Sequence, residues 1–250
     1  MRKVKSMKQS IFKILSNEKI AADVFKMTLR GDISDITAPG QFVNIRLDGF
    51  YLRRPISVCD AEGDVLTLIY KVVGGGTEKM SAICGGEELD LLTGLGNGFD
   101  TNASGSAPLV IGGGVGAPPM YLLCKRLIGQ GKSVTAVLGF NSKSDVFLTR
   151  ELEALGARVF VATADGSFGS HGFVTDILPR DYSYFYACGP EPMLKAVHDR
   201  TKTEGELSFE ERMGCGFGAC MGCTCKTKYG NKRICRDGPV LKKSEVIFDD

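Results

Sequence analysis

The chain of 250 residues is long enough for two small domains and an appended segment. Its 31 Lys and Arg residues nearly balance its 29 Asp and Glu residues, whereas nucleic-acid-binding proteins usually carry a strong excess of positive charge. We therefore expect no nucleic-acid partner.

The beginning of the chain does not resemble a secretory signal. Residues 1–10 are basic. The apolar run that follows, 11–14, is too short for the core of a signal peptide and is interrupted by Lys13. The longest uncharged stretch, 101–124, contains a glycine-rich run at 112–116 and two prolines at 118–119, which an isolated membrane span would tolerate badly. The sequence therefore predicts a cytoplasmic protein without a membrane-spanning segment.

Residues 8–100 consist of short β-rich runs separated by turns. The runs cover residues 42–47, 52–58 and 65–73. Pro39-Gly40 and Glu62-Gly63-Asp64 mark two of the turns. Short strands at this spacing are typical of a small antiparallel barrel, and we assign residues 1–103 to this first domain.

Two motifs in the predicted barrel favour a flavin nucleotide. In the run 52–58, Arg54 offers a cation for a phosphate while Ile56 and Ser57 can face a planar ring; an ordinary surface arginine pair is the alternative. The next strand runs into three glycines and a threonine at 74–77, and such a loop can cradle a diphosphate or serve as a plain flexible turn. Their occurrence in one barrel favours the flavin.

From Ala107 the pattern changes to apolar runs separated by stretches with helical periodicity. The runs cover residues 109–111, 134–138, 159–162 and 184–187. This alternation is typical of a parallel α/β sheet. A small, polar linker at 102–106 separates it from the barrel, and we assign residues 104–206 to this nucleotide-binding domain.

Two turns of this second domain are candidate nucleotide sites, because open α/β sheets bind ligands at the carboxyl ends of their strands. The first turn contains Gly112, Gly113, Gly114 and Gly116. It precedes a helix start marked by Pro118-Pro119, where the pattern departs from G-x-G-x-x-G. The second turn is Cys188-Gly189-Pro190, in which Cys188 either lines the ring pocket, as the candidate catalytic residue, or is a buried thiol.

The segment 207–250 is too short for a core of its own and holds five of the nine Cys residues. Cys215, Cys220 and Cys223 follow C-x4-C-x2-C spacing, with Cys235 further along, which is the plant-type arrangement of [2Fe–2S] ligands. Interleaved glycines allow the loop to wrap a cluster closely. A zinc site is the alternative, although a second close Cys pair is missing; Cys225 is expected to be a packed residue rather than a ligand.

Several motifs resemble those of a known family. Arg54-Pro55-Ile56-Ser57 resembles the Arg-x-Tyr/Phe-Ser flavin motif of the ferredoxin–NADP⁺ reductase superfamily, with Ile56 in place of the aromatic residue. Cys188-Gly189-Pro190 resembles the nicotinamide motif of that superfamily. With the Cys motif and the closing sequence CRDGPV at 235–240, the whole chain resembles the electron-transfer subunits of type B dihydroorotate dehydrogenases.

The resemblance implies a set of site residues. The implied FAD contacts are Arg54, Pro55, Ile56, Ser57, Ile69, Tyr70, Lys71, Gly75, Gly76 and Thr77. The implied cluster ligands are Cys215, Cys220, Cys223 and Cys235. Asp165, in the turn 164–169, would lie near the nicotinamide nucleotide. The residues after the second parallel strand, 139–145, include both a cation and an acid, so NAD is preferred over NADP from the resemblance alone.

The resemblance also implies a partner and a pathway. An FMN-containing dihydroorotate dehydrogenase subunit, in a heterotetramer of two copies of each chain, would supply electrons that pass through the cluster and FAD to NAD⁺ during pyrimidine (UMP) synthesis. Met213, Phe217 and Met221 flank the cluster motif and are expected either at the partner interface or packed on the flavin domain. The alternatives are the small subunits of a ferredoxin–NADP⁺ transhydrogenase, a sulfide dehydrogenase or a hydrogenase diaphorase.

Overall fold

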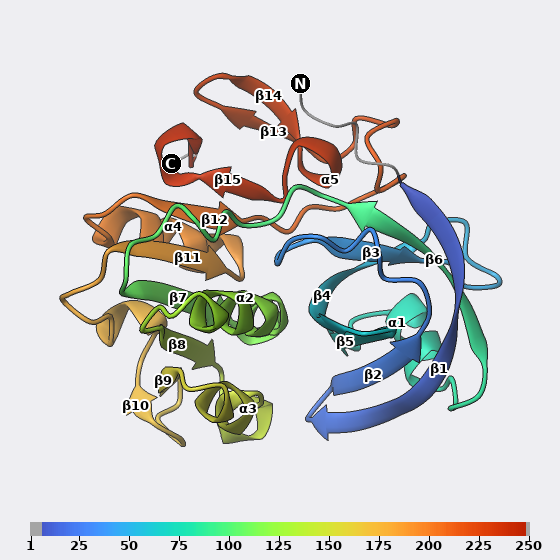
Figure 1. Cartoon of the computed structure of the whole chain (residues 1–250), viewed down its shortest axis with the longest axis horizontal. Coiled ribbons are helices and arrows are strands. Elements are labelled where there is room, and N and C mark those ends of the chain that lie inside the picture. The colour runs from blue at the N-terminus through green and yellow to red at the C-terminus, as the bar shows by residue number, and fades with distance from the viewer. Residues whose placement is uncertain (1–6, 249–250) are drawn as a thin grey trace.

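The computed structural model describes residues 7–248, which form a barrel, a sheet domain and a C-terminal segment that lies across both (Figure 1). Most of the basic N-terminal stretch lies outside the described residues. No helix within 7–248 combines the length and apolar character needed to cross a bilayer.

The first domain is a closed antiparallel barrel, as predicted. Its strands are β1 (Lys8–Ala21), β2 (Val24–Arg30), β3 (Phe42–Ile45), β4 (Arg54–Glu62), β5 (Val65–Lys71) and β6 (Glu88–Leu95), in the order β1-β2-β5-β4-β3-β6. Alternation along β3 places Val43 and Ile45 in the barrel core, while Phe42 packs into the hydrophobic cluster on the other side of the strand. Helix α1 (Gly75–Ser81) follows β5 and buries Met80 in the barrel core.

The second domain contains the predicted parallel sheet. Its strands are β7 (Pro108–Gly113), β8 (Thr135–Phe140), β9 (Arg158–Thr163), β10 (Ser170–His171), β11 (Tyr184–Cys188), β12 (Gly205–Ser208) and β15 (Val240–Lys242), in the order β10-β9-β8-β7-β11-β12-β15. Only β15 runs antiparallel to its neighbour. The helices are α2 (Ala117–Gly129), α3 (Thr149–Ala154) and α4 (Glu191–Arg200), with 3-10 turns at Gly114–Gly116, Lys143–Asp145, Val174–Asp176 and Lys243–Glu245.

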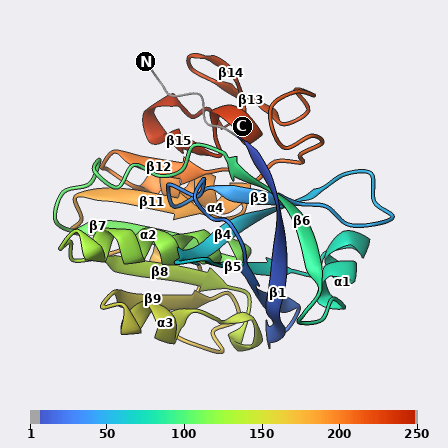
Figure 2. The ribbon, with the colours of Figure 1, turned by 45° about the vertical axis from the view of Figure 1, so that its right-hand side comes forward.

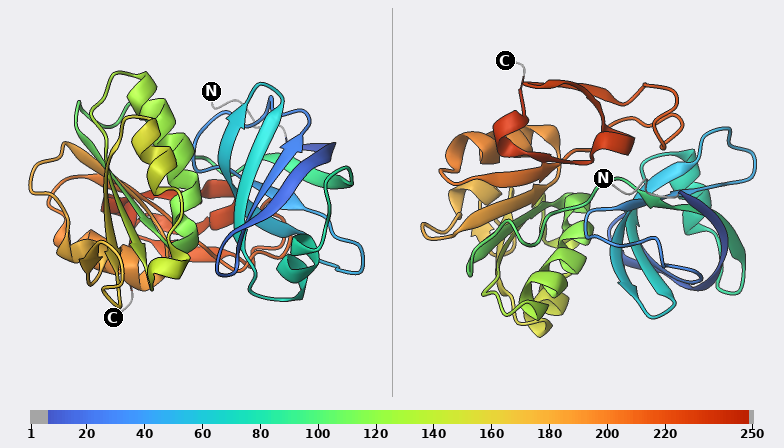
Figure 3. Two further views of the ribbon diagram at one scale, coloured as in Figure 1. Left: turned by 90° about the horizontal axis from the view of Figure 1, so that it is seen from below. Right: turned by 45° about the horizontal axis from the view of Figure 1, so that its top comes forward.

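The two domains share a continuous core and an ion-pair cluster. Helix α2 lies between the sheet and the barrel (Figures 2 and 3), and Cys59 and Ile69 of the barrel join its buried residues in one hydrophobic cluster. At the edge of this contact Lys125 Nζ lies 2.9 Å from Asp60 Oδ2 and 2.7 Å from Glu62 Oε2. The relative position of barrel and sheet is therefore fixed by packing as well as by the linker.

The C-terminal segment is attached to both domains. It contains the hairpin of β13 (Thr224–Thr227) and β14 (Gly230–Arg233) and the short helix α5 (Ile234–Asp237), and it extends above both domains in Figure 1. Strand β15 then completes the parallel sheet by pairing with β12. The predicted boundary between residues 206 and 207 falls inside β12, and the three domain ranges remain predictions.

Candidate functional site

The two adjacent arginines at the start of β4 have different surroundings. Arg53 donates from Nη1 and Nη2 to the two carboxylate oxygens of Asp90, at 3.0 and 3.1 Å. Burial opposes ionisation of Asp90, but the Arg53 hydrogen bonds and charge outweigh it and keep the pKa of this carboxyl below its ordinary value. Arg54 instead lies over the Phe50 ring, 4.7 Å from its centroid, and donates to the carbonyl of Leu52 at 2.6 Å. Arg54 thus keeps its charge available for a phosphate.

The glycine loop before α1 approaches Arg54 closely. A Cβ on Gly76 would lie 2.0 Å from Arg54 Nε, so a larger residue here would displace the Arg54 side chain. The Thr77 hydroxyl accepts from the N–H groups of Val73 at 2.9 Å and Gly74 at 3.3 Å, which fixes the shape of the loop. A cation held against a rigid glycine loop fits the diphosphate of FAD.

The three predicted FAD contacts on β5 have different surroundings. Ile69 belongs to the core shared with α2, and Tyr70 is 2% exposed, donates to Asn17 Oδ1 at 2.9 Å and stacks on Phe25. Burial raises the pKa of Tyr70 to about 12. These two side chains therefore position the strand, whereas Lys71 lines an open cavity between the domains.

This cavity has a volume of about 650 Å³ and brings together several of the predicted nucleotide residues. From the barrel it is lined by Val24 and Lys71, and from the sheet domain by both glycine turns. The predicted residues in its lining are Lys71, Gly113, Gly114 and Pro190. It lies at the carboxyl ends of the parallel strands, where α/β sheets bind nucleotides.

Three other predicted glycines lie beneath the cavity and do not line it. A Cβ on Gly116 would lie 2.2 Å from the carbonyl oxygen of Cys188, so the two turns pack directly on each other. A Cβ on Gly112 would lie 2.8 Å from Ala117 Cα, and one on Gly189 would lie 2.6 Å from Met193 Cε. These glycines allow close packing beneath the cavity.

Cys188 is a buried thiol beneath the cavity. Burial raises its pKa well above its usual range, and the charge of Glu210 adds to the shift. It is therefore a neutral group, which suits a residue that packs beside a ring better than one that takes a proton. Its assignment as a catalytic residue remains a prediction.

Glu210 was not expected from the sequence. It lines the cavity two residues after the end of β12, and burial raises its pKa. A signal for this residue was present in the sequence, because Glu210 is an acidic residue just beyond a short stretch of alternating polar and apolar residues. That stretch was not predicted to be a strand of the sheet, so Glu210 was not assigned to the site.

Asp165 shapes a turn at the edge of the site. Its carboxylate accepts from the hydroxyl of Ser167 at 2.6 Å and from its N–H at 3.0 Å, and the hydroxyl bond is the main cause of its lowered pKa. Ser167 Oγ in turn accepts from the N–H of Lys143 at 2.8 Å, which ties the loops after β8 and β9 together. Asp165 is absent from the cavity lining described above, so its nucleotide contact remains a prediction.

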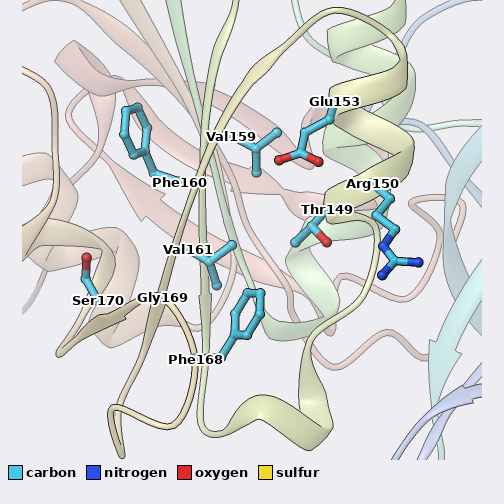
Figure 4. Close-up of a pocket in the computed structure, with 9 residues that line it drawn as sticks. All are labelled: Thr149, Arg150, Glu153, Val159, Phe160, Val161, Phe168, Gly169 and Ser170. Carbon is cyan, nitrogen blue, oxygen red and sulfur yellow. The ribbon is translucent and has the colours of Figure 1, made fainter.

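A second, smaller cavity of about 380 Å³ lies between α3 and β9, with Arg150 and Glu153 on the helix side (Figure 4). Phe168 and Gly169 border it from the turn that precedes β10. None of the sequence-predicted site residues is among those that line it.

The four predicted cluster ligands form two pairs. The N–H of Cys215 donates to Cys220 Sγ and the N–H of Cys220 donates to Cys215 Sγ, both at 3.4 Å. The N–H of Cys235 donates to Cys223 Sγ, also at 3.4 Å. Two thiol pairs with backbone N–H donors fit a [2Fe–2S] cluster, in which each iron takes two thiolates.

Within residues 7–248, no three His, Cys, Asp or Glu side chains are arranged to hold one metal ion. Cys225 is partly buried and packs against the neighbouring hydrophobic cluster.

Two sequence families match parts of the chain. Residues 210–247 match the iron–sulfur cluster binding domain of dihydroorotate dehydrogenase B, and residues 110–199 match the oxidoreductase NAD-binding domain. The first match covers all four paired thiols, and the second covers both glycine turns.

Curated relatives match nearly the full length. The electron transfer subunit of dihydroorotate dehydrogenase B (NAD(+)) from Shouchella clausii is 42% identical over 96% of this chain and 99% of its own length. The subunit of the same name from Bacillus pumilus is 43% identical over 97% of this chain and 99% of its own length.

Solved structures share the architecture. An NADH-dependent reduced ferredoxin-NADP oxidoreductase, studied for flavin-based electron bifurcation, is 29% identical with a TM-score of 0.86, covering 95% of this chain and 90% of the other. A ferredoxin NADP⁺ reductase from Neisseria gonorrhoeae with bound FAD and NADP is 17% identical with a TM-score of 0.67, covering 77% and 90%. The second likeness shows the fold alone.

Proposed function

The chain belongs to the electron-transfer subunits of NAD⁺-linked dihydroorotate dehydrogenase B, and from this premise we propose that it carries electrons from the FMN of a catalytic subunit to NAD⁺. Its cofactors are FAD, a [2Fe–2S] cluster and NAD, and its role lies in pyrimidine (UMP) synthesis. FAD supplies the exchange between single electrons and a hydride when it is bound. A cytoplasmic location remains a prediction.

The observation that carries this proposal is the pairing of Cys215 with Cys220 and of Cys223 with Cys235 in a segment that packs on both the flavin barrel and the nucleotide sheet. Electron transfer across a protein requires cofactors held at fixed, short separations, and a segment anchored to both domains supplies that constraint. The family of the chain then identifies the donor as a dihydroorotate-oxidising subunit.

We assign a separate set of residues to each of the three cofactors. Arg54 and the loop at Gly75, Gly76 and Thr77 would hold the FAD diphosphate, and Pro55, Ile56 and Ser57 would face its ring. Lys71, Gly113, Gly114 and Pro190 would receive the nicotinamide nucleotide, since they line the cavity between the domains. The four paired thiols would hold the cluster.

The proposal is tested with the purified complex of this chain and its catalytic subunit. We expect iron and acid-labile sulfide in equal amounts, bound FAD, and NAD⁺ reduction that depends on dihydroorotate. A complex that oxidises dihydroorotate with a dye but reduces no NAD⁺, although it is fully loaded with cofactors, would contradict the proposal.

A ferredoxin-linked reductase is the second candidate, favoured by the TM-score of 0.86 to the electron-bifurcating enzyme. The identity of 29% to that protein is lower than the 42% to the dihydroorotate dehydrogenase subunit. Affinity isolation of the chain with its native partner separates the two candidates, because a ferredoxin-dependent partner without FMN would support the second.

We further propose that Phe217 and Met221 contact the catalytic subunit in a heterotetramer of two copies of each chain. They are 44% and 55% exposed beside the thiols, whereas Met213 packs against the hydrophobic cluster of its own chain. Large apolar side chains that are exposed around a redox centre are suited to a protein interface.

Phe217→Asp should therefore prevent assembly, because a carboxylate at the centre of an apolar contact would be desolvated without a partner. Native mass spectrometry would show the free chain in place of the complex, with iron and FAD content unchanged. Phe168→Asp, at a phenylalanine that is 40% exposed on the sheet domain, is the matched control and should assemble normally. Normal assembly of Phe217→Asp would exclude this interface.

A further inference from the structure

Asn44 occupies the place where the flavin strand and the cluster segment meet. It lies on β3 directly across from Pro55 of the flavin motif, on the face of β3 that also carries Phe42. Its neighbours Val43 and Ile45 face the barrel core, so the Asn44 side chain projects away from that core. It is nevertheless only 1% exposed, because the cluster segment covers it.

The side chain of Asn44 holds the first cluster ligand through the backbone. Asn44 Nδ2 donates to the carbonyl oxygen of Cys215 at 3.0 Å, a contact between residues 171 positions apart. A Cβ on Gly216 would lie 2.3 Å from Nδ2, so the loop presses directly against the amide. Gly216 has a φ of 78°, the left-handed conformation that favours glycine.

The other end of the same amide is unsatisfied. Asn44 Oδ1 is buried and has no hydrogen-bond partner among the described residues. Buried side-chain polar atoms normally have a partner. Among the described residues, the bond to Cys215 is therefore the hydrogen bond that holds this buried side chain in place.

We propose that Asn44 is a positioning residue that fixes the Cys215 arm of the cluster against the flavin strand, and so sets the geometry between the two cofactors. This inference rests on the proposed function, because it assumes that electrons pass between cluster and flavin. Asn44 reaches the cluster only through the backbone of Cys215, and its effect is on placement and on the field around the ligand.

The test compares Asn44→Ala with Asn97→Ala in the isolated full-length chain. Asn97 also ties the barrel to the C-terminal segment, through bonds to Val240 O at 2.7 Å and Asp237 O at 3.3 Å, but it contacts no ligand residue in these bonds. It is therefore a matched control of the same residue type between the same two parts of the chain.

In Asn44→Ala we expect the rate at which NADH reduces the cluster through the flavin to fall about tenfold, as for other residues that support metal ligands. The EPR line shape and midpoint potential of the reduced cluster should change as well, with iron content retained. Asn97→Ala should leave the rate, the EPR signal and the potential as in the wild type. Asn44→Ser, whose hydroxyl is too short to reach Cys215, should reproduce the Asn44→Ala result.

Unchanged rate, EPR signal and potential in both Asn44 variants would overturn the proposal, and so would equal changes in Asn97→Ala. Loss of iron from both Asn44 variants, with Asn97→Ala still loaded, would assign Asn44 to ligand retention and would also overturn a positioning role. These readouts need no catalytic subunit. Failure of the wild-type complex to couple dihydroorotate to NAD⁺ would instead count against the proposed function.

Discussion

Cys223→Ser should abolish dihydroorotate-dependent reduction of NAD⁺ while leaving NADH-dependent reduction of a dye by the flavin. Cys223 is buried and pairs with Cys235 at the centre of the segment, so its replacement removes one of the two thiolates on one side of the cluster. We expect coupled activity to fall at least about 100-fold, the upper end of the loss seen when even an outer partner of a metal ligand is removed.

The flavin reaction should persist because the predicted FAD residues lie on the barrel. Stopped-flow or steady-state assays of both reactions, with iron determined on the same samples, measure this separation. Cys225→Ser is the matched control, since it changes a thiol of the same segment that lies outside the two pairs. Equal loss of both reactions in Cys223→Ser would mean that the segment is needed for flavin binding rather than for transfer.

Arg54→Gln should weaken FAD binding with little effect on the stability of the barrel. A charged hydrogen bond to a phosphate contributes about 2 kcal/mol, so the Kd for FAD should rise about 30-fold. Fluorescence of released flavin gives the Kd, and thermal unfolding of the apoprotein gives the stability. Arg53→Gln is the control with the opposite result, because it removes the bidentate pair with Asp90 and should lower stability more than FAD affinity.

A second pair of variants tests the same site from the loop side. Gly76→Ala would push a methyl group into Arg54, whereas Gly75→Ala would place it 3.6 Å from Phe50, an ordinary contact. We expect Gly76→Ala to weaken FAD binding as Arg54→Gln does. Gly75→Ala should bind normally, because the loop would hold the diphosphate through its backbone N–H groups, which alanine retains. Normal FAD affinity in both Arg54→Gln and Gly76→Ala would place the diphosphate elsewhere.

Local patterns were sufficient for much of this architecture. Alternating apolar residues and turn residues predicted the barrel, and the change of period after Ala107 predicted the parallel sheet. The spacing of Cys215, Cys220 and Cys223 predicted the thiol segment because cluster ligands are set by short-range geometry. Each of these signals depends on residues that are close in sequence.

The features that sequence reasoning missed depend on distant contacts. The sequence pointed to Arg54 as the phosphate ligand, but the structural role of its neighbour Arg53 appears only when Asp90 is placed across the barrel from it. Asn44 resembles an ordinary strand residue until Cys215 is placed against it. Glu210 becomes part of the cavity only because β12 lies beside β11. No local pattern encodes such pairings.

Strand β15 has a consequence for the sheet that it completes. It closes the β12 side of the sheet with three residues that follow the last cluster ligand, so the N–H and C=O groups of Gly205–Ser208 on that side are paired. An uncovered sheet edge is a template for pairing with other chains and a point of attack for proteases. The residues that follow the thiols therefore protect the nucleotide-binding sheet from unwanted association.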